Sequence, residues 1–142
     1  MEVKLTWQEG VYFHGQAREH TIPIEGPETS GGKNRGARPM ETILVGLASC
    51  SAYDVLSILA KSRQPVAGCE VDVTAKRSDA IPSVFTEILL HFRFTSIAGQ
   101  QGLDNDALLR AIGLSVDKYC SVAKMLRDGG VLIKHSHVIE EL

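Results

Sequence analysis

The chain has 142 residues, the length of one domain. Apolar residues make up 44% and charged residues 23%, proportions typical of a globular protein and unlike those of a disordered chain. The formal net charge is −2, so charge gives no reason to expect nucleic acid or an anionic membrane as a partner. We therefore expect a single domain over residues 1–142 with a core of its own.

Cysteine content and the first residues favour a reducing, cytoplasmic setting with free thiols. The three cysteines cannot all pair within the chain, and residues 1–4 lack the apolar stretch of a secretory signal. Residues 43–60 have the length of a membrane span, but they include Asp54, whose burial at a bilayer centre costs about 2.5–3.5 kcal/mol. We interpret this stretch as a buried core helix and expect no membrane contact.

Alternating apolar residues predict a small sheet at the start of the chain. Val3, Leu5 and Trp7 alternate with polar residues, which is typical of a half-buried strand. Two more strands are predicted before residue 25, and Pro23 places the last of them near a sheet edge.

Residues 25–38 are rich in glycine and predict a flexible surface loop. The loop contains Gly31-Gly32-Lys33, but a phosphate-binding loop would need glycine at Pro27 and Ser or Thr at Asn34. Phosphate binding is therefore not expected there.

A long helix is predicted over residues 39–62, with Pro39 and Glu41 suited to its first turn. It is apolar nearly all round, as a central core helix would be.

The second half of the chain alternates strands with two helices. Strands are predicted at 69–76, 84–95 and 131–139, and helices at 105–113 and 115–127. The resulting order, β-β-β-α-β-β-α-α-β, is that of an α+β fold.

Two cysteines on predicted helices could carry chemistry. Cys50 stands between Ser49 and Ser51 among small residues, which leave room beside a thiol. Cys120 lies in the second of the later helices, so the two thiols can meet only if their helices pack together. A buried cysteine is often just a small apolar residue. A redox pair also needs a neighbour that stabilises a thiolate and some access to solvent.

Residues 39–55, PMETILVGLASCSAYDV, resemble the central-helix signature of the OsmC/Ohr family, in which Pro-x-Glu precedes a run of Leu and Ala, a small pair and Cys. Residues 118–123, KYCSVA, resemble the second motif of the family and stand at its usual separation from the first. The resemblance implies an OsmC-like α+β fold, with antiparallel sheets packed on a long central helix. It also implies an intertwined homodimer.

For function, the resemblance implies a peroxiredoxin-like thiol peroxidase of oxidative-stress defence that reduces organic hydroperoxides. Cys50 would attack the hydroperoxide as a thiolate and become a sulfenic acid, and Cys120 would condense with it to a disulfide. A dithiol reductant would restore both thiols. No cofactor and no metal are expected.

The resemblance further implies an arginine that stabilises the Cys50 thiolate and is held by a glutamate at the start of the central helix. Glu41, nine residues before Cys50, is the candidate for the glutamate. Arg18 is the candidate for the arginine, and Arg35 and Arg38 are its rivals. A first-turn carboxylate also stabilises the helix dipole by itself, and a surface arginine is often only solvated.

Two positions depart from the peroxidase branches of the family. Met40 stands where the hydroperoxide reductases have their glutamate, and Ser121 stands where they usually have proline. In these positions the chain more closely resembles the YhfA-like subgroup of OsmC-like proteins. The alternative function is a non-catalytic redox-sensing or small-ligand-binding protein on the same fold. A cysteine acyltransferase or hydrolase would need a histidine beside the thiol, and neither cysteine helix contains one.

The remaining candidates are a third cysteine and two histidines. Cys69 matches no motif, and we expect a buried structural thiol. His135 and His137 lie on one face of the last predicted strand, but no third ligand is placed with them. We expect them to be ordinary histidines of a sheet surface.

Overall fold

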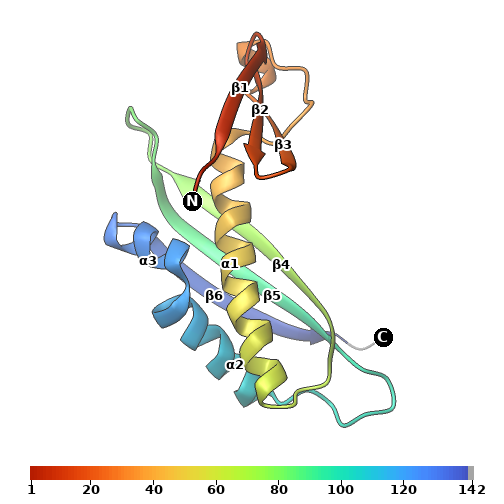
Figure 1. Cartoon of the computed structure of the whole chain (residues 1–142). Coiled ribbons are helices and arrows are strands. Elements are labelled where there is room, and N and C mark those ends of the chain that lie inside the picture. The colour runs from red at the N-terminus through yellow and green to blue at the C-terminus, as the bar shows by residue number, and fades with distance from the viewer. Residues whose placement is uncertain (141–142) are drawn as a thin grey trace. The chain divides into compact units, whose positions relative to one another are not determined.

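The computed structural model describes residues 1–140 (Figure 1). The chain forms two compact units, Met1–Val45 and Gly46–Leu142, and each contains one sheet. Helix α1 begins in the first unit and ends in the second. The strands and α-helices follow one another in the predicted order, which confirms the α+β class.

The first unit contains a three-stranded antiparallel sheet of β1 (Lys4–Glu9), β2 (Tyr12–Ala17) and β3 (His20–Glu25). β3 is an edge strand, as Pro23 predicts, because a proline has no N–H to donate to a further strand. The prediction of a half-buried first strand is wrong within this chain, since Leu5 is 61% exposed and Trp7 65% exposed. β1 therefore keeps its apolar side on the surface.

A buried carboxylate fixes the loop that was predicted to be flexible. Glu25 is 1% exposed and accepts hydrogen bonds from the Arg35 backbone N–H at 2.8 Å and from its Nη2 at 2.7 Å. The same guanidinium reaches Glu9 at 2.6 Å and lies 4.0 Å from the centre of the Tyr12 ring. The hydrogen bonds from the Arg35 side chain hold the pKa of Glu25 at about 2, well below its ordinary value.

Helix α1 (Pro39–Lys61) begins and ends within a residue of its predicted bounds. Its first turn is capped by Glu41, which accepts a hydrogen bond from the Arg38 backbone N–H at 2.8 Å. The buried residues repeat every four positions and so share one face of the helix: Leu47, Ser51, Val55 and Leu59.

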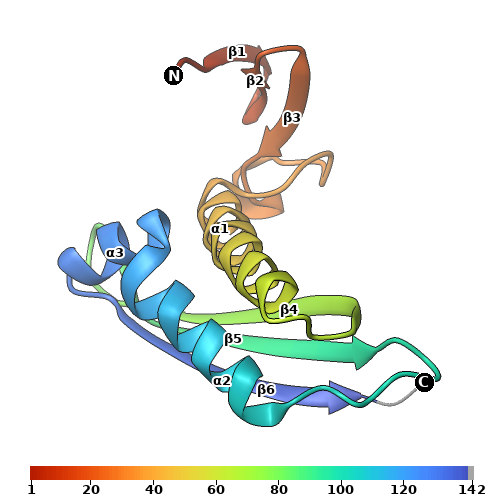
Figure 2. The ribbon, with the colours of Figure 1, turned by 60° about the horizontal axis from the view of Figure 1, so that its bottom comes forward.

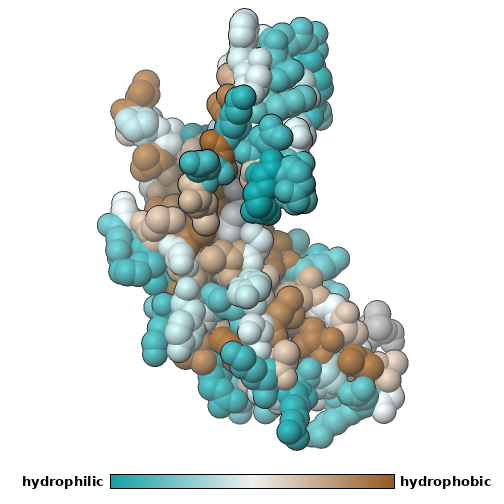
Figure 3. Space-filling model, in the orientation of Figure 1, coloured by the Kyte–Doolittle hydropathy of each residue, from teal (hydrophilic) through white to brown (hydrophobic). Residues whose placement is uncertain are grey.

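The rest of α1 is not the all-round core helix that was predicted. By length and a mean hydropathy of 1.8 it could cross a membrane, and 22% of that apolar window is buried. Apolar side chains on its other faces, including Ile43, Tyr53 and Leu56, are exposed. Figure 3 shows apolar surface beside α1 on the face in view. Within this chain, α1 is thus a core helix along one stripe only.

The second unit is built on a sheet with the order β4–β5–β6. β4 (Val66–Arg77) and β5 (Phe85–Ser96) are antiparallel, as predicted for a hairpin, and β6 (Leu132–Glu140) lies parallel to β5. The helices between β5 and β6 return the chain to its starting end, which permits parallel pairing. One face of β5 supplies the centre of the core: Ile88, Leu90, Phe92 and Phe94.

Helices α2 (Asn105–Leu114) and α3 (Ser121–Asp128) and the end of α1 cover this face of the sheet (Figure 2). The prediction of one helix over 115–127 is wrong. The chain forms a π-helix at Ser115–Tyr119 and breaks at Cys120, whose backbone is extended (φ −71°, ψ 111°). Cys120 therefore lies at the start of a helix and not in its middle.

We expect Glu25→Gln to lower the melting temperature most above about pH 5 and least near pH 2. The folded-state pKa of Glu25 is depressed from 4.5 to about 2. Its ion pair therefore stabilises the fold fully above the ordinary pKa, and the stabilisation is lost as the pH falls toward the folded value. Melting curves recorded by circular dichroism across this pH range measure the effect.

Glu28→Gln is the matched control, because it removes an exposed carboxylate from the same loop. It should leave the melting curves unchanged. Equal effects of the two substitutions at every pH would show that the burial of Glu25 does not govern the loop.

Candidate active site at two thiols

The structure brings Cys50 of α1 and Cys120 at the start of α3 together. Both are free thiols, and Cys120 is 1% exposed whereas Cys50 is partly exposed. Burial is the main cause that raises the pKa of Cys120, and the neighbouring Cys50 thiol raises it further. A buried thiol therefore lies close to one on a partly exposed residue, an arrangement that suits a redox pair.

Two hydrogen-bond donors point at the Cys120 sulfur. The Ser51 hydroxyl donates at 3.3 Å and the Ala123 backbone N–H donates at 3.4 Å. The second bond is the N-cap bond of α3, in which an oxygen of Ser, Thr, Asp or Asn is the usual acceptor. Both donors lower the pKa of Cys120 and so oppose the larger effect of burial. The sulfur thus joins the start of α3 to α1.

Ser115 and Arg127 hold the backbone around this pair. Ser115 is fully buried, and its hydroxyl donates to the Ser51 carbonyl at 2.8 Å and lies 3.4 Å from the Asp54 carboxylate. The Arg127 guanidinium donates to two carbonyls of the π-helix. The Cys120 N–H closes the π turn on the Ser115 carbonyl at 2.7 Å. Isolated π turns of this kind are frequent at functional sites.

A hollow of about 420 Å³ is lined by residues that are close in sequence to each of the two cysteines. Asp54 lies one helical turn after Cys50 on α1, and Tyr119 directly precedes Cys120. The hollow is large enough for a small organic molecule. Its lining is mixed in polarity: Asp54, Ser57, Ile58, Lys61, Leu114 and Tyr119.

The other predicted site residues lie in the first unit. The Glu41 carboxylate accepts a hydrogen bond at the start of α1. Arg18 lies in the turn between β2 and β3 with a φ of +54°. The Arg35 guanidinium forms ion pairs with Glu25 and Glu9. The assignment of Arg18 and Glu41 to the Cys50 thiolate stays a prediction.

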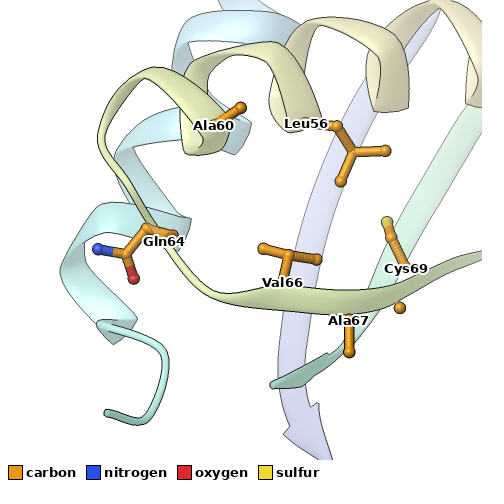
Figure 4. Close-up of a pocket in the computed structure, with 7 residues that line it drawn as sticks. Leu56, Ala60, Gln64, Val66, Ala67 and Cys69 are labelled. Atoms are coloured by element: carbon orange, nitrogen blue, oxygen red, sulfur yellow. The ribbon is translucent and has the colours of Figure 1, made fainter. Parts of the chain in front are cut away.

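Cys69 lies on β4, beside a separate groove of about 370 Å³ (Figure 4). Its sulfur points toward α1, and Leu56 and Val66 also point into the groove. Burial raises the pKa of the Cys69 thiol, and the Glu70 carboxylate raises it further. A thiol with a raised pKa is a weak nucleophile at neutral pH, which fits a structural role. The side chain is half-buried, however, and not fully buried as predicted.

His135 and His137 share one face of β6, but it is the face beneath the helices and not an open sheet surface. They pair in register with Leu90 and Phe92 of the core, and His137 Nε2 donates to Asn105 Oδ1 at 2.7 Å. Among residues 1–140, no group of three or more histidine, cysteine or acidic side chains is arranged to hold a metal ion.

Ser51 and Ser115 are the site residues that sequence reasoning missed. In the sequence, Ser51 is only one of several small residues and Ser115 is only a possible helix cap. Their hydroxyls matter because of contacts between α1 and segments more than sixty residues later in the chain. The one local signal is a serine directly after a cysteine in a strongly apolar helix.

We expect Ser115→Ala to lower the free energy of unfolding by about 1–2 kcal/mol, because a buried hydrogen bond to the Ser51 carbonyl is lost. Ser62→Ala is the control, since the Ser62 hydroxyl is exposed and bonds to carbonyls of its own helix. It should cost less than about 0.5 kcal/mol. Urea denaturation measures both. A loss for Ser115→Ala no larger than that for Ser62→Ala would contradict the bracing role.

Comparisons with known proteins agree with this architecture. Protein YhfA of Escherichia coli strain K12 is 43% identical over 140 residues, which is 98% of each chain. The crystal structure of a hypothetical protein from Aquifex aeolicus VF5 matches with a TM-score of 0.84 and 28% identity, over 99% of this chain and 96% of that one. The organic hydroperoxide resistance protein OhrB of Bacillus subtilis shares the fold, with a TM-score of 0.64 and 14% identity over 96% of each chain. A family model described as OsmC-like protein matches residues 31–136, and the chain therefore belongs to the OsmC-like protein family.

Proposed function

We propose that this protein is a thiol-dependent peroxidase that reduces organic hydroperoxides in defence against oxidative stress. The interaction between Cys50 and Cys120 carries the proposal, because a partly exposed thiol stands beside a buried one. Such a pair can pass through a sulfenic acid to a disulfide without any cofactor. Family membership adds support, since a protein of the same fold is named for organic hydroperoxide resistance.

The reaction uses the two sulfurs in turn. The Cys50 thiolate attacks the terminal oxygen of the hydroperoxide, the O–O bond breaks, and the alkoxide leaves and takes up a proton to become an alcohol. The Cys120 sulfur then attacks the sulfur of the Cys50 sulfenic acid, so that water leaves and a disulfide forms. A dithiol reductant supplies two electrons and two protons and restores both thiols.

The first step needs a cation near Cys50, because the thiolate is the nucleophile. We assign this role to Arg18, held by Glu41, with Arg38 as the rival. Arg35 is the weaker candidate because two carboxylates already bind its guanidinium. The hollow lined by Asp54 and Tyr119, which are close in sequence to Cys50 and Cys120, is the candidate place for the organic group.

The proposal is tested by mixing the reduced protein with one equivalent of cumene hydroperoxide and following free thiols and intact mass. The wild type should promptly lose two thiols together with the mass of two hydrogen atoms. Cys120→Ser should instead accumulate a sulfenic acid on Cys50 that a dimedone-type reagent traps.

Cys69→Ser is the matched control, because its thiol belongs to a different groove. It should react as the wild type does. A Cys50 that stays a thiol over minutes would overturn the peroxidase proposal and favour the ligand-binding alternative on the same fold.

We further propose that the protein acts as a cytoplasmic homodimer. Leu5 and Trp7 on β1, together with apolar side chains of α1, are exposed in the single chain. Exposed apolar surface of this kind is usually covered by a partner. A second copy of the chain would cover it, and a reducing cytoplasm would keep the thiols free.

Leu5→Glu should shift the protein from dimer to monomer, because it places a charge on the exposed apolar side of β1. Thr6→Glu is the matched control on the opposite side of the same strand. Sedimentation equilibrium measures both. A monomeric wild type, or a Leu5→Glu variant as dimeric as the control, would reject the homodimer.

A further inference from the structure

We propose that Ser51 and the Ala123 N–H form a thiolate-stabilising site for Cys120 during reduction of the disulfide. In this step Cys50 is the sulfur that the reductant attacks, and Cys120 is the leaving group. The inference rests on the proposed function only in that it takes a Cys50–Cys120 disulfide as the oxidised state.

The geometry suits a sulfur that becomes negative. Ser51 is fully buried and donates to Cys120 Sγ at 3.3 Å, and the Ala123 N–H donates at 3.4 Å. Cys120 also stands at the N-terminus of α3, where the helix dipole favours negative charge. A neutral sulfur is a weak acceptor, whereas a thiolate is a strong one. The two hydrogen bonds therefore strengthen as the leaving group develops charge.

Burial decides which sulfur is attacked. Cys120 is 1% exposed, so an entering thiolate cannot reach it, whereas Cys50 is partly exposed. The reductant thiolate forms a new S–S bond with Cys50 as the old bond breaks, and the electron pair of that bond goes to Cys120 Sγ. The second thiol of the dithiol then displaces Cys50 and leaves as a disulfide. The two protons of the dithiol end on Cys50 and Cys120.

A comparison with Ser115 distinguishes hydrogen-bond donation to the sulfur from structural support of the site. Ser115 is as deeply buried as Ser51, but its hydroxyl donates to the Ser51 carbonyl and not to the sulfur. Ser115→Ala therefore removes an equally buried hydroxyl near the same sulfur without removing a donor to it.

The first test is a thiolate titration by ultraviolet absorbance in a Cys50→Ser, Cys69→Ser background, where Cys120 is the one remaining cysteine. Adding Ser51→Ala should raise the pKa of Cys120 by about one to two units, the range expected for one hydrogen bond to a charged group. Adding Ser115→Ala should raise that pKa by less than Ser51→Ala does, because it removes a brace of the Ser51 backbone and not a donor to the sulfur. An unchanged pKa in the Ser51→Ala protein would overturn the proposal.

The second test measures reduction of the disulfide by dithiothreitol, after oxidation with diamide so that no peroxide is involved. Ser51→Ala should slow this step by about threefold to tenfold relative to the wild type and to Ser115→Ala, because a leaving thiol of higher pKa leaves more slowly.

The cysteine that the reducing thiol attacks is identified in the wild type, which avoids any folding defect of a variant. A brief exposure to 2-mercaptoethanol, followed by acid quenching and peptide mass mapping, should place the mixed disulfide on Cys50. A mixed disulfide on Cys120 would overturn the proposal.

The outcomes separate this inference from the proposed function. If diamide forms the disulfide and Ser51→Ala shows both effects, the inference stands even where cumene hydroperoxide is not reduced. If peroxide is reduced but Ser51→Ala behaves as the wild type does, the inference fails and the peroxidase remains. Failure of diamide to join Cys50 and Cys120 would overturn both.

Discussion

Cys120 is the residue at which three helical segments are joined by hydrogen bonds, two of them to its sulfur. It takes the N-cap bond of α3 from the Ala123 N–H and a hydrogen bond from Ser51 on α1. The N–H of the same residue closes the π-helix on the Ser115 carbonyl. Because these bonds share one residue, the backbone break, the burial of the thiol and its interaction with Cys50 depend on one another. A substitution that changes the local fold here would therefore also change the chemistry of this sulfur.

Local patterns predict most of the elements but not the break between the last two helices. Alternation locates the strands, and Pro39 and Asp104 mark the starts of α1 and α2. Nothing between residues 115 and 127 is a glycine or a proline, so the pattern reads as one helix. The chain divides there because α1 supplies a donor to Cys120, and such tertiary contacts have no local signature. A register shift near the end of β4 is equally hidden, and it turns Phe85 instead of Val84 toward the core.

The sequence also predicts only part of the candidate site. Cys50 and Cys120 stand out in the sequence because each lies within a motif, and the structure brings them together. The sequence offers three arginines without ranking them by environment. Only the burial of Glu25 reveals that Arg35 is bound, since an acidic residue at the end of a short strand is ordinarily solvated. Sequence patterns thus identify reactive groups, whereas their partners require the fold.

The parallel pairing of β6 with β5 has a consequence for how the chain folds. Within residues 1–140, every antiparallel pair joins strands that are neighbours in the sequence, so those hairpins can form while the chain is still being made. The open edge of β5, by contrast, has no partner until the two later helices and residues 132–140 have been synthesised. An unpaired apolar strand edge invites pairing with another chain. The interval before β6 docks is therefore the stage at which a nascent chain is most exposed to aggregation.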